Sequence, residues 1–181
     1  MAGNGKVQVQ MIGFATLKLT SPNGKVLLVD PWLTGNDFFP DGNPAVPDKY
    51  KKDVGEFGNV DIVLQTHAHF DHLNLNDMVA IAERFDPIIL TPVETAVYIR
   101  EHTDLQNFCN GGFGMNRGTL PPIDGITVSG VHCEHTSSEI ELLENGRLKG
   151  RDIGDPIGFV VEFENGFKVY ISSDTGLCSD L

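Results

Sequence analysis

Cysteines are scarce in this chain of 181 residues. The three that are present, Cys109, Cys133 and Cys178, are far apart, and no two stand in a CxxC spacing. An odd number of scattered cysteines argues against a disulfide framework and is typical of proteins in a reducing compartment. We therefore expect a cytoplasmic protein.

Long apolar runs are also missing. Hydrophobic residues make up 40% of the chain, but no run approaches the roughly 18 apolar residues of a membrane helix. The first twenty residues show no basic stretch followed by an apolar segment, so we expect no secretory signal. No membrane partner is expected.

Basic residues are few, with 13 lysines and arginines against 25 acidic residues and a net charge of −12. The only basic cluster is "DKYKKD", residues 48–53. Proteins that bind a phosphate backbone usually present a basic face. Nucleic acid is therefore not an expected partner, although bound metal ions would offset part of the negative charge locally. A small-molecule substrate fits this composition better.

The length suits one domain over residues 1–181, and no internal repeat is present. Residues 6–11, 14–20 and 25–29 read as strands, and Asn23-Gly24 predicts a hairpin between the last two. A second hairpin is predicted around Asn165-Gly166. In it, the alternating apolar residues of 158–163 should face those of 167–172, which are Phe167, Val169 and Ile171.

The periodicity changes between these hairpins. Residues 60–65 and 87–91 are short apolar runs typical of buried strands, and apolar residues at helical spacing predict a helix that ends before Pro87. Thr91 is predicted to cap a further helix that starts at Pro92. Residues 34–58, 103–122 and 136–157 are predicted to be irregular. This order indicates a layered α/β or α+β fold.

The stretch "THAHFDHL", residues 66–73, holds three of the six histidines. In an extended segment His67 and His69 point to the same side, so they can share one ion. Asp71 and His72 follow at an expected bend, where they can turn toward a second point nearby. Imidazole suits zinc, and a carboxylate suits zinc or a harder ion. A solvated polar loop would rarely concentrate these residue types at this spacing.

The pattern H-x-H-x-D-H after an apolar strand resembles the metallo-β-lactamase superfamily, in its branch of generic metal-dependent hydrolases, with lactonases as more distant relatives. "VDPWLTGN" upstream and "EHTSS" and "SSDTG" downstream follow in the order of that family. The resemblance implies an α+β fold, the αββα sandwich. It also implies one metal held by His67, His69 and His135. His132 is an alternative to His135, which is favoured because a hydroxyl-rich turn follows it.

The same resemblance implies a second metal held by Asp71, His72 and Asp174, with Asp174 bridging the two ions and Asp30 supporting the site from behind. Two departures stand out. Ser173 takes the place of a glycine that usually precedes the bridging aspartate. The family also normally continues beyond a point equivalent to Leu181, with elements that carry a last histidine. We therefore expect a C-terminally truncated domain that lacks its last layer elements, and an exposed edge or face that favours a homo-oligomer.

The function that the resemblance implies is a metal-dependent hydrolase that uses a metal-bound hydroxide to cleave a small ester, lactone or phosphoester. Asp71 would orient the water and could take a proton. The cofactor would be zinc, one or two per chain, with manganese or iron possible. Two alternatives remain open: a phosphodiesterase or nuclease of the same fold, or a chain that binds metal with little catalysis. Redox chemistry on iron is a less favoured option.

Two other features have ordinary explanations. His102 is predicted to cap a helix end or lie on the surface. The glycine-rich stretch 112–118 could hold a small anion with Arg117, or could be a plain loop.

Overall fold

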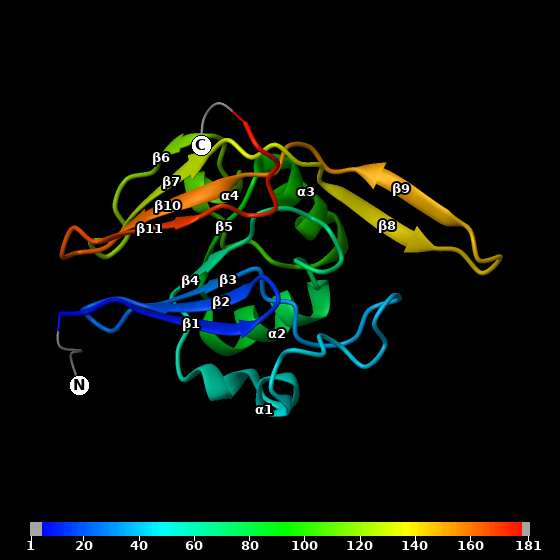
Figure 1. The fold of residues 1–181 in the computed structure, drawn as a ribbon, viewed down its shortest axis with the longest axis horizontal. Coiled ribbons are helices and arrows are strands. Elements are labelled where there is room, and N and C mark those ends of the chain that lie inside the picture. Colours follow the sequence, from blue (N-terminus) through cyan, green and yellow to red (C-terminus); the bar gives the residue numbers. More distant parts are fainter. Residues whose placement is uncertain (1–4, 179–181) are drawn as a thin grey trace.

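The computed structural model describes residues 5–178, which form two stacked sheets and a separate two-stranded ribbon (Figure 1). The first sheet has the strand order β1-β2-β3-β4-β5. Its first three strands are antiparallel, and β3, β4 and β5 run parallel. The bounds are β1 (Gln8–Gly13), β2 (Thr16–Thr20), β3 (Val26–Val29), β4 (Ile62–Leu64) and β5 (Ile88–Leu90).

The second sheet has the order β11-β10-β7-β6, and all of its strand pairs are antiparallel. The bounds are β6 (Gly118–Thr119), β7 (Thr127–Val131), β10 (Gly158–Glu162) and β11 (Lys168–Ile171). Both predicted hairpins are confirmed, β2 with β3 and β10 with β11. The predicted register of the second hairpin is also confirmed, since Ile171 and Val169 pair with Phe159 and Val161, and the Phe163 N–H donates to the Phe167 carbonyl at 2.9 Å. Phe167 itself is 55% exposed beside the turn.

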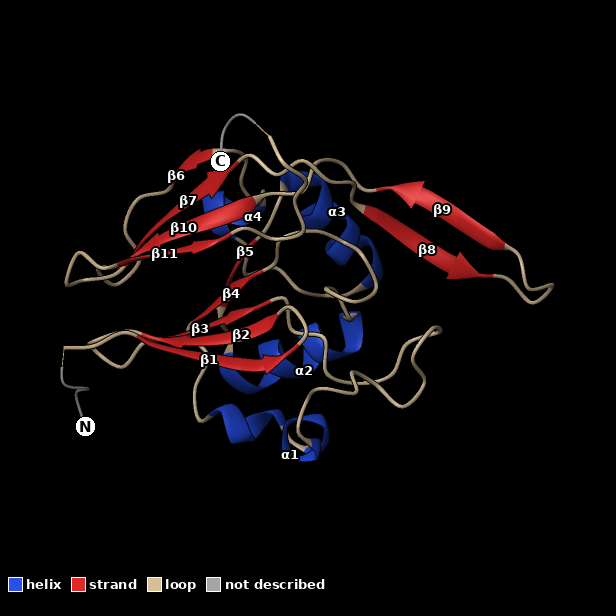
Figure 2. Cartoon of the chain, viewed as in Figure 1, coloured by secondary structure: helices blue, strands red, loops and turns tan. Residues whose placement is uncertain are grey.

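The helices flank the first sheet (Figure 2). They are α1 (Asp48–Lys52), the short 3-10 helix η1 (Val54–Phe57), α2 (Leu75–Phe85), α3 (Val93–His102) and α4 (Cys109–Gly112). The predicted helix before Pro87 is α2, which Asn74 caps by accepting from the backbone N–H groups of Asn76 and Asp77. The segments 34–58 and 103–122, which were predicted to be irregular, contain four short elements: α1 and η1 in the first, and α4 and β6 in the second.

Two apolar cores explain this layering. One face of the first sheet packs against the helices through residues such as Leu28, Val63, Met78 and Ile81. The other face packs against the second sheet through residues such as Leu64 and Phe159 in a separate cluster. This is the expected α+β arrangement. The outward-facing residues of β7 and β10 are only half-buried and those of β11 are exposed, and this is the face that a fourth layer covers in an αββα sandwich.

The prediction of Thr91 as a helix cap is wrong. The cap position belongs to Pro92 and α3 begins at Val93, without a side-chain capping bond. Thr91 is fully buried and its hydroxyl has no hydrogen-bond partner within the part of the chain that the structure describes. Burial of the residue by the surrounding core overrides the local capping preference.

The prediction that residues 136–157 are irregular is also wrong in part. This segment forms an antiparallel ribbon of β8 (Ser138–Leu142) and β9 (Leu148–Asp152), which projects from the body of the molecule (Figure 1). Its charged composition hides the apolar alternation that marks a strand. The turn signal Asn145-Gly146 is present in the sequence and could have indicated the hairpin.

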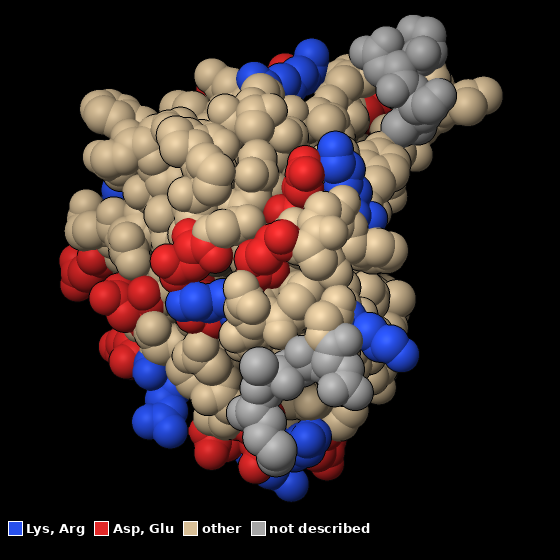
Figure 3. Space-filling model, turned by 90° about the vertical axis from the view of Figure 1, so that its left-hand side faces the viewer, with Lys and Arg blue, Asp and Glu red and all other residues tan. Residues whose placement is uncertain are grey.

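Strand direction brings several chain segments to one end of the sandwich. The β1–β2 turn and the C-terminal ends of β3, β4, β7 and β11 all lie there, because β3 and β4 are parallel and β7 and β11 are both antiparallel to β10. Figure 3 shows the opposite end, where acidic and basic side chains are interspersed. No helix in residues 5–178 is long and apolar enough to cross a membrane.

Candidate metal centre

The histidine-rich segment leaves β4 and bends before α2. His69 makes this bend, since its carbonyl accepts hydrogen bonds from the backbone N–H groups of His72 and Leu73 at 3.0 and 2.8 Å. The Ser137 hydroxyl, in the loop between β7 and β8, fixes the segment by accepting from the Ala68 N–H at 3.1 Å. The turn therefore holds His67, His69 and His72 close together at the end of the first sheet.

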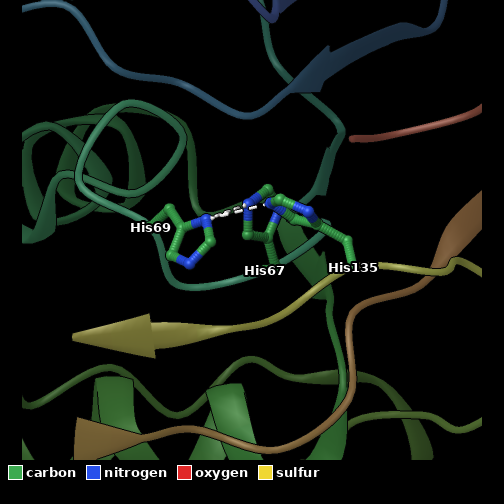
Figure 4. Close-up of side chains that lie close together, drawn as sticks. All are labelled: His67, His69 and His135. Atoms are coloured by element: carbon green, nitrogen blue, oxygen red, sulfur yellow. Dashed lines mark hydrogen bonds between the residues drawn. The ribbon is translucent and has the colours of Figure 1, made fainter. Parts of the chain in front are cut away.

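Three imidazoles converge on one point (Figure 4). The distance from His67 Nε2 to His69 Nδ1 is 3.0 Å, and that from His135 Nε2 to His69 Nδ1 is 3.3 Å. His135 comes from the loop after β7, so the two sheets share this cluster. The ring nitrogens of all three residues lie within 4.8 Å of one another.

This donor set fits a zinc-like ion. Ligand nitrogens at 2.0–2.1 Å around a tetrahedral ion are separated by about 3.3 Å, close to the two distances observed. A hydrogen bond would explain only one of the two contacts made by His69 Nδ1, because a ring nitrogen has either one proton to donate or one lone pair to accept with. The convergence of three ring nitrogens is the arrangement that a cation requires.

A second group lies beside the first. His67, His72 and Asp174 also offer atoms within 4.8 Å of one another. Asp174 Oδ2 is 3.4 Å from His72 Nε2 and 3.8 Å from His135 Nε2, so its carboxylate faces both groups. Asp174 follows β11 and is half exposed, whereas His67 and His72 are buried. The site thus opens to solvent on the Asp174 side.

Oxygen atoms contact the far side of the rings and set their tautomers. His72 directs its Nε2 toward Asp174, and its Nδ1 donates to Asp30 Oδ2 at 2.9 Å. His67 Nδ1 lies 2.9 Å from the Thr66 hydroxyl, which donates to Asp30 Oδ2 at 2.8 Å. His69 Nε2 lies 3.1 Å from the Ser138 hydroxyl. In His67 and His69, a proton on the outer nitrogen leaves a lone pair on the nitrogen that faces the cluster.

The electrostatics of the rings differ. Burial lowers the pKa of His67 to about 2, helped by the neighbouring His72, His69 and His135. Burial and then His135 also lower the pKa of His69. Burial opposes the charge on His72, but its bond to Asp30 and the nearby carboxylates outweigh this and raise its pKa to about 9. At neutral pH His67 and His69 are therefore uncharged and available as ligands.

The sequence of this chain matches a known protein family. A family model described as "Beta-lactamase superfamily domain" matches residues 25–181, most of the chain. The chain belongs to the metallo-β-lactamase superfamily. The resemblance seen in the sequence is therefore confirmed.

The relatives of this superfamily member are named as metal-dependent hydrolases. One from Polynucleobacter asymbioticus is 34% identical over 179 residues, which are 98% of this chain and 59% of that protein. One from Rubrobacter xylanophilus is 32% identical over 177 residues, covering 98% of this chain and 64% of that protein. The chain thus spans about 60% of the length of these curated relatives.

Two solved structures show the same fold. A possible metal-dependent hydrolase from Veillonella parvula has a TM-score of 0.65 at 23% identity, over 96% of this chain and 64% of that one. An isothiocyanate hydrolase from Delia radicum gut bacteria has a TM-score of 0.65 at 25% identity, over 95% and 64%.

Most of the predicted site residues of this metallo-β-lactamase-like chain meet in the structure. His67, His69 and His135 form one group, and His72 and Asp174 join His67 in the other. Asp71 belongs to neither group, but it is close enough for its charge to favour protonation of His69 and His72. It is half-buried on the same bend.

His132 does not join the cluster. Its Nε2 lies 3.2 Å from Glu134 Oε2, and its Nδ1 is buried without a partner among the described residues. His132 and His135 are three positions apart on the chain segment after β7, and the loop turns only His135 toward His69.

Sequence reasoning missed three hydroxyl residues: Thr66 and Ser138, which contact His67 and His69, and Ser137, which holds the backbone of Ala68 between them. Thr66 directly precedes His67 in the sequence. Its hydrogen bond to the Asp30 carboxylate depends on the fold, so the sequence did not indicate it. Ser173, the departure from the usual glycine, has φ 59° and places its hydroxyl 3.4 Å from His67 Nδ1.

The two remaining candidates lie away from the cluster. His102 is the last residue of α3, and its Nδ1 lies 2.8 Å from the Tyr98 carbonyl, as a helix-end residue does. Arg117 is half exposed and lies 3.6 Å from Asp155.

Proposed function

We propose that this chain carries the metal centre of a metal-dependent hydrolase that cleaves a small ester, lactone or phosphoester. The observation that supports the proposal most directly is the convergence of three histidine nitrogens on one point, with a second group that shares His67 and includes Asp174. The names of the relatives point the same way.

The residues that would hold metal follow from the two groups. His67, His69 and His135 would hold the first ion, and His72 with Asp174 would hold the second, with Asp71 as a further ligand on the same bend. When bound, the ions supply Lewis-acid chemistry: they acidify a coordinated water and polarise the bond under attack. Zinc suits the imidazole-rich first group, and manganese or iron suits a group richer in carboxylates.

The chain's own residues then have separable tasks. Asp30 and Thr66 hold His72 and His67 in the tautomer that presents Nε2 to the cluster. Asp71 would accept the proton of the attacking water on a carboxylate oxygen. The half-exposed Asp174 side leaves room for substrate to approach, while the buried His67 side excludes water.

Two further expectations remain proposals. We propose that the partner is a small molecule rather than nucleic acid or a membrane, and that the protein works in the cytoplasm as a homo-oligomer. Phosphodiester cleavage, as in a nuclease of the same fold, is disfavoured by the net charge of −12. The isothiocyanate hydrolase among the solved structures adds one more probe to test.

The decisive experiment is elemental analysis of protein purified without added metal, beside His69→Ala and the control His102→Ala. We expect about two equivalents of metal in wild type and in the control, with loss in His69→Ala. The same preparations would be assayed with p-nitrophenyl acetate, a γ-lactone, bis-p-nitrophenyl phosphate and an alkyl isothiocyanate. Bound metal without turnover of any probe would favour the metal-binding alternative. Absence of metal from folded wild type would overturn the proposal.

A further inference from the structure

A long groove lies on the helix side of the molecule. It has a volume of about 920 Å³ and runs beside α2, which covers the face of the first sheet that points away from the second sheet (Figure 2). One wall is α2 from Leu75 to Asp86, and the other is formed by residues 102–107 after α3, with Ile89 of β5 between them. None of the described residues that line the groove belongs to the two groups of the metal centre. The metal centre therefore does not explain this groove.

Hydrogen bonds hold the two walls of the groove together at one end. The Ile89 N–H donates to the Asn107 carbonyl at 2.8 Å, which fixes the second wall to β5. The side-chain amide of Asn107 donates to the carbonyls of Asp86 and Pro87 at 3.2 and 3.1 Å, at the end of α2. A ligand would therefore meet a groove that is already ordered, and binding would not have to order its walls first.

The face of α2 that lines the groove has apolar residues of its own. Leu75, Val79 and Ala80 lie beside the stripe that α2 packs into the core, and all three are half-buried. Residues at positions i, i+4 and i+5 share one face of a helix. Leu105 adds a half-buried apolar side chain from the opposite wall. Apolar contact is thus available along α2, whose 11 residues span about 16 Å.

The charged side chains of the groove are acidic. Glu83, Asp86 and Asp104 line it, and all three residues are exposed. Apart from these acids, His102 is the titratable residue among the described lining residues, and none of them is a lysine or an arginine. The groove therefore presents negative charge beside its apolar surface.

Two helix ends add to this negative charge. The C-terminal ends of α2, at Asp86, and of α3, at His102, both line the groove. The C-terminal end of a helix carries a partial negative charge and favours a nearby cation. Asp86 places a carboxylate at the cap position of α2, with φ 49°, where glycine or asparagine is preferred. An acid at this position is electrostatically unfavourable by itself, and a cation bound in the groove would offset this.

We propose that this groove binds a basic amphipathic helix of a partner protein. The apolar side chains of the partner helix pack on the half-buried face of α2, and its lysines or arginines meet the acidic side chains and the two helix ends. Helix-in-groove binding of this kind uses apolar residues at helical spacing. Long basic side chains suit the site because their aliphatic stems cover apolar surface while their charged ends reach the acids. Binding there does not depend on the proposed hydrolase activity.

A second copy of this chain fits the groove less well. Its only basic cluster is residues 48–53, which contain α1. This helix has five residues, fewer than half the length of α2. Lys49 and Lys52 in it already pair with Glu56 and Asp48, at 3.4 and 4.0 Å. A partner with a longer basic helix therefore matches the groove better.

The test is the binding of labelled synthetic peptides to the full chain, measured by fluorescence anisotropy. The first peptide has the length of α2 and contains lysines and leucines, with the leucines at helical spacing. The second has the same composition in scrambled order, and the third has glutamate in place of each lysine. We expect the first peptide to bind at least about tenfold more tightly than the scrambled one, because only its leucines lie on one face. The glutamate peptide should not bind.

Two variants locate the bound peptide. Ala80→Arg places a long basic side chain in the groove and should weaken binding at least about tenfold. Arginine is a good helix former, so α2 should persist. Glu83→Gln combined with Asp104→Asn removes two acidic charges from the groove and should weaken binding at least about fivefold. The control combines Glu144→Gln with Asp37→Asn, the same chemical changes at exposed positions elsewhere, and should bind as wild type does.

Equal binding of the ordered and scrambled peptides would overturn the proposal, because the net charge of −12 alone would then explain the attraction. An equal loss of affinity in the control double variant would do the same. Self-association of wild type in sedimentation velocity, lost in Ala80→Arg, without any peptide binding, would overturn the proposal in favour of a second copy. Should Ala80→Arg melt early, the double variant decides, since both of its residues are exposed.

Discussion

Asp30 and His72 face each other in the interior, with Oδ2 and Nδ1 2.9 Å apart and both residues almost fully buried. The same carboxylate accepts from the N–H and the hydroxyl of Thr66 at 2.7 and 2.8 Å. One buried aspartate therefore receives three hydrogen bonds and connects directly or indirectly to two histidines of the cluster. A substitution of Asp30 should therefore affect both His72 and, through Thr66, His67.

Replacement of Asp30 by asparagine should weaken metal binding by about 10–100-fold, the usual effect of losing a partner behind a ligating histidine. The asparagine amide would face two donors with an N–H group, and the negative charge that helps raise the pKa of His72 would be lost. The measurement is the zinc dissociation constant by chelator competition. Asp61→Asn, at the Lys25 ion pair of the opposite end, is the control and should bind zinc as wild type does.

Thr66→Val should reduce zinc affinity by about tenfold, because valine keeps the shape but removes the hydroxyl that lies between Asp30 and His67. Thr95→Val makes the same chemical change at a buried hydroxyl without a partner among the described residues. That control should leave zinc affinity unchanged and raise the free energy of unfolding by roughly 1 kcal/mol. Equal zinc affinities of the two variants would contradict a role for Thr66.

Ser173→Gly should stabilise the fold by up to about 1 kcal/mol, since residue 173 has φ 59° and glycine adopts this conformation without strain. The hydroxyl that is lost lies 3.4 Å from His67 Nδ1, a weaker contact than that of Thr66. Zinc binding should therefore persist. Urea unfolding of the metal-free protein measures the stability change, and a clear destabilisation would show that the serine side chain is structurally required.

Removal of metal should lower the thermal stability of the protein. A ligand that binds only the folded state contributes about 2.7 kcal/mol at a free concentration one hundred times its dissociation constant. We expect the melting temperature to fall when EDTA is added to wild type and to the His102→Ala control. In His69→Ala the chelator should change the melting temperature much less. A chelator effect of the same size in all three proteins would point to metal bound elsewhere.

The sequence by itself determined the elements whose signals are local. Asn23-Gly24 and Asn165-Gly166 predicted two hairpins because these residues suit tight turns. The helix before Pro87 followed from the spacing of its apolar residues. The histidine pattern of residues 66–73, with its partners in order, predicted the superfamily. These features depend on neighbours along the chain, so they can be read without the fold.

Tertiary structure decided what depends on contacts between distant segments. Burial moved the start of α3 past Thr91, and cross-strand pairing formed the β8–β9 ribbon where local apolar alternation is weak. Only the parallel run of β3 and β4 brings Asp30 beside Thr66 and His72. Only the meeting of the two sheets turns His135, and not His132, toward His69.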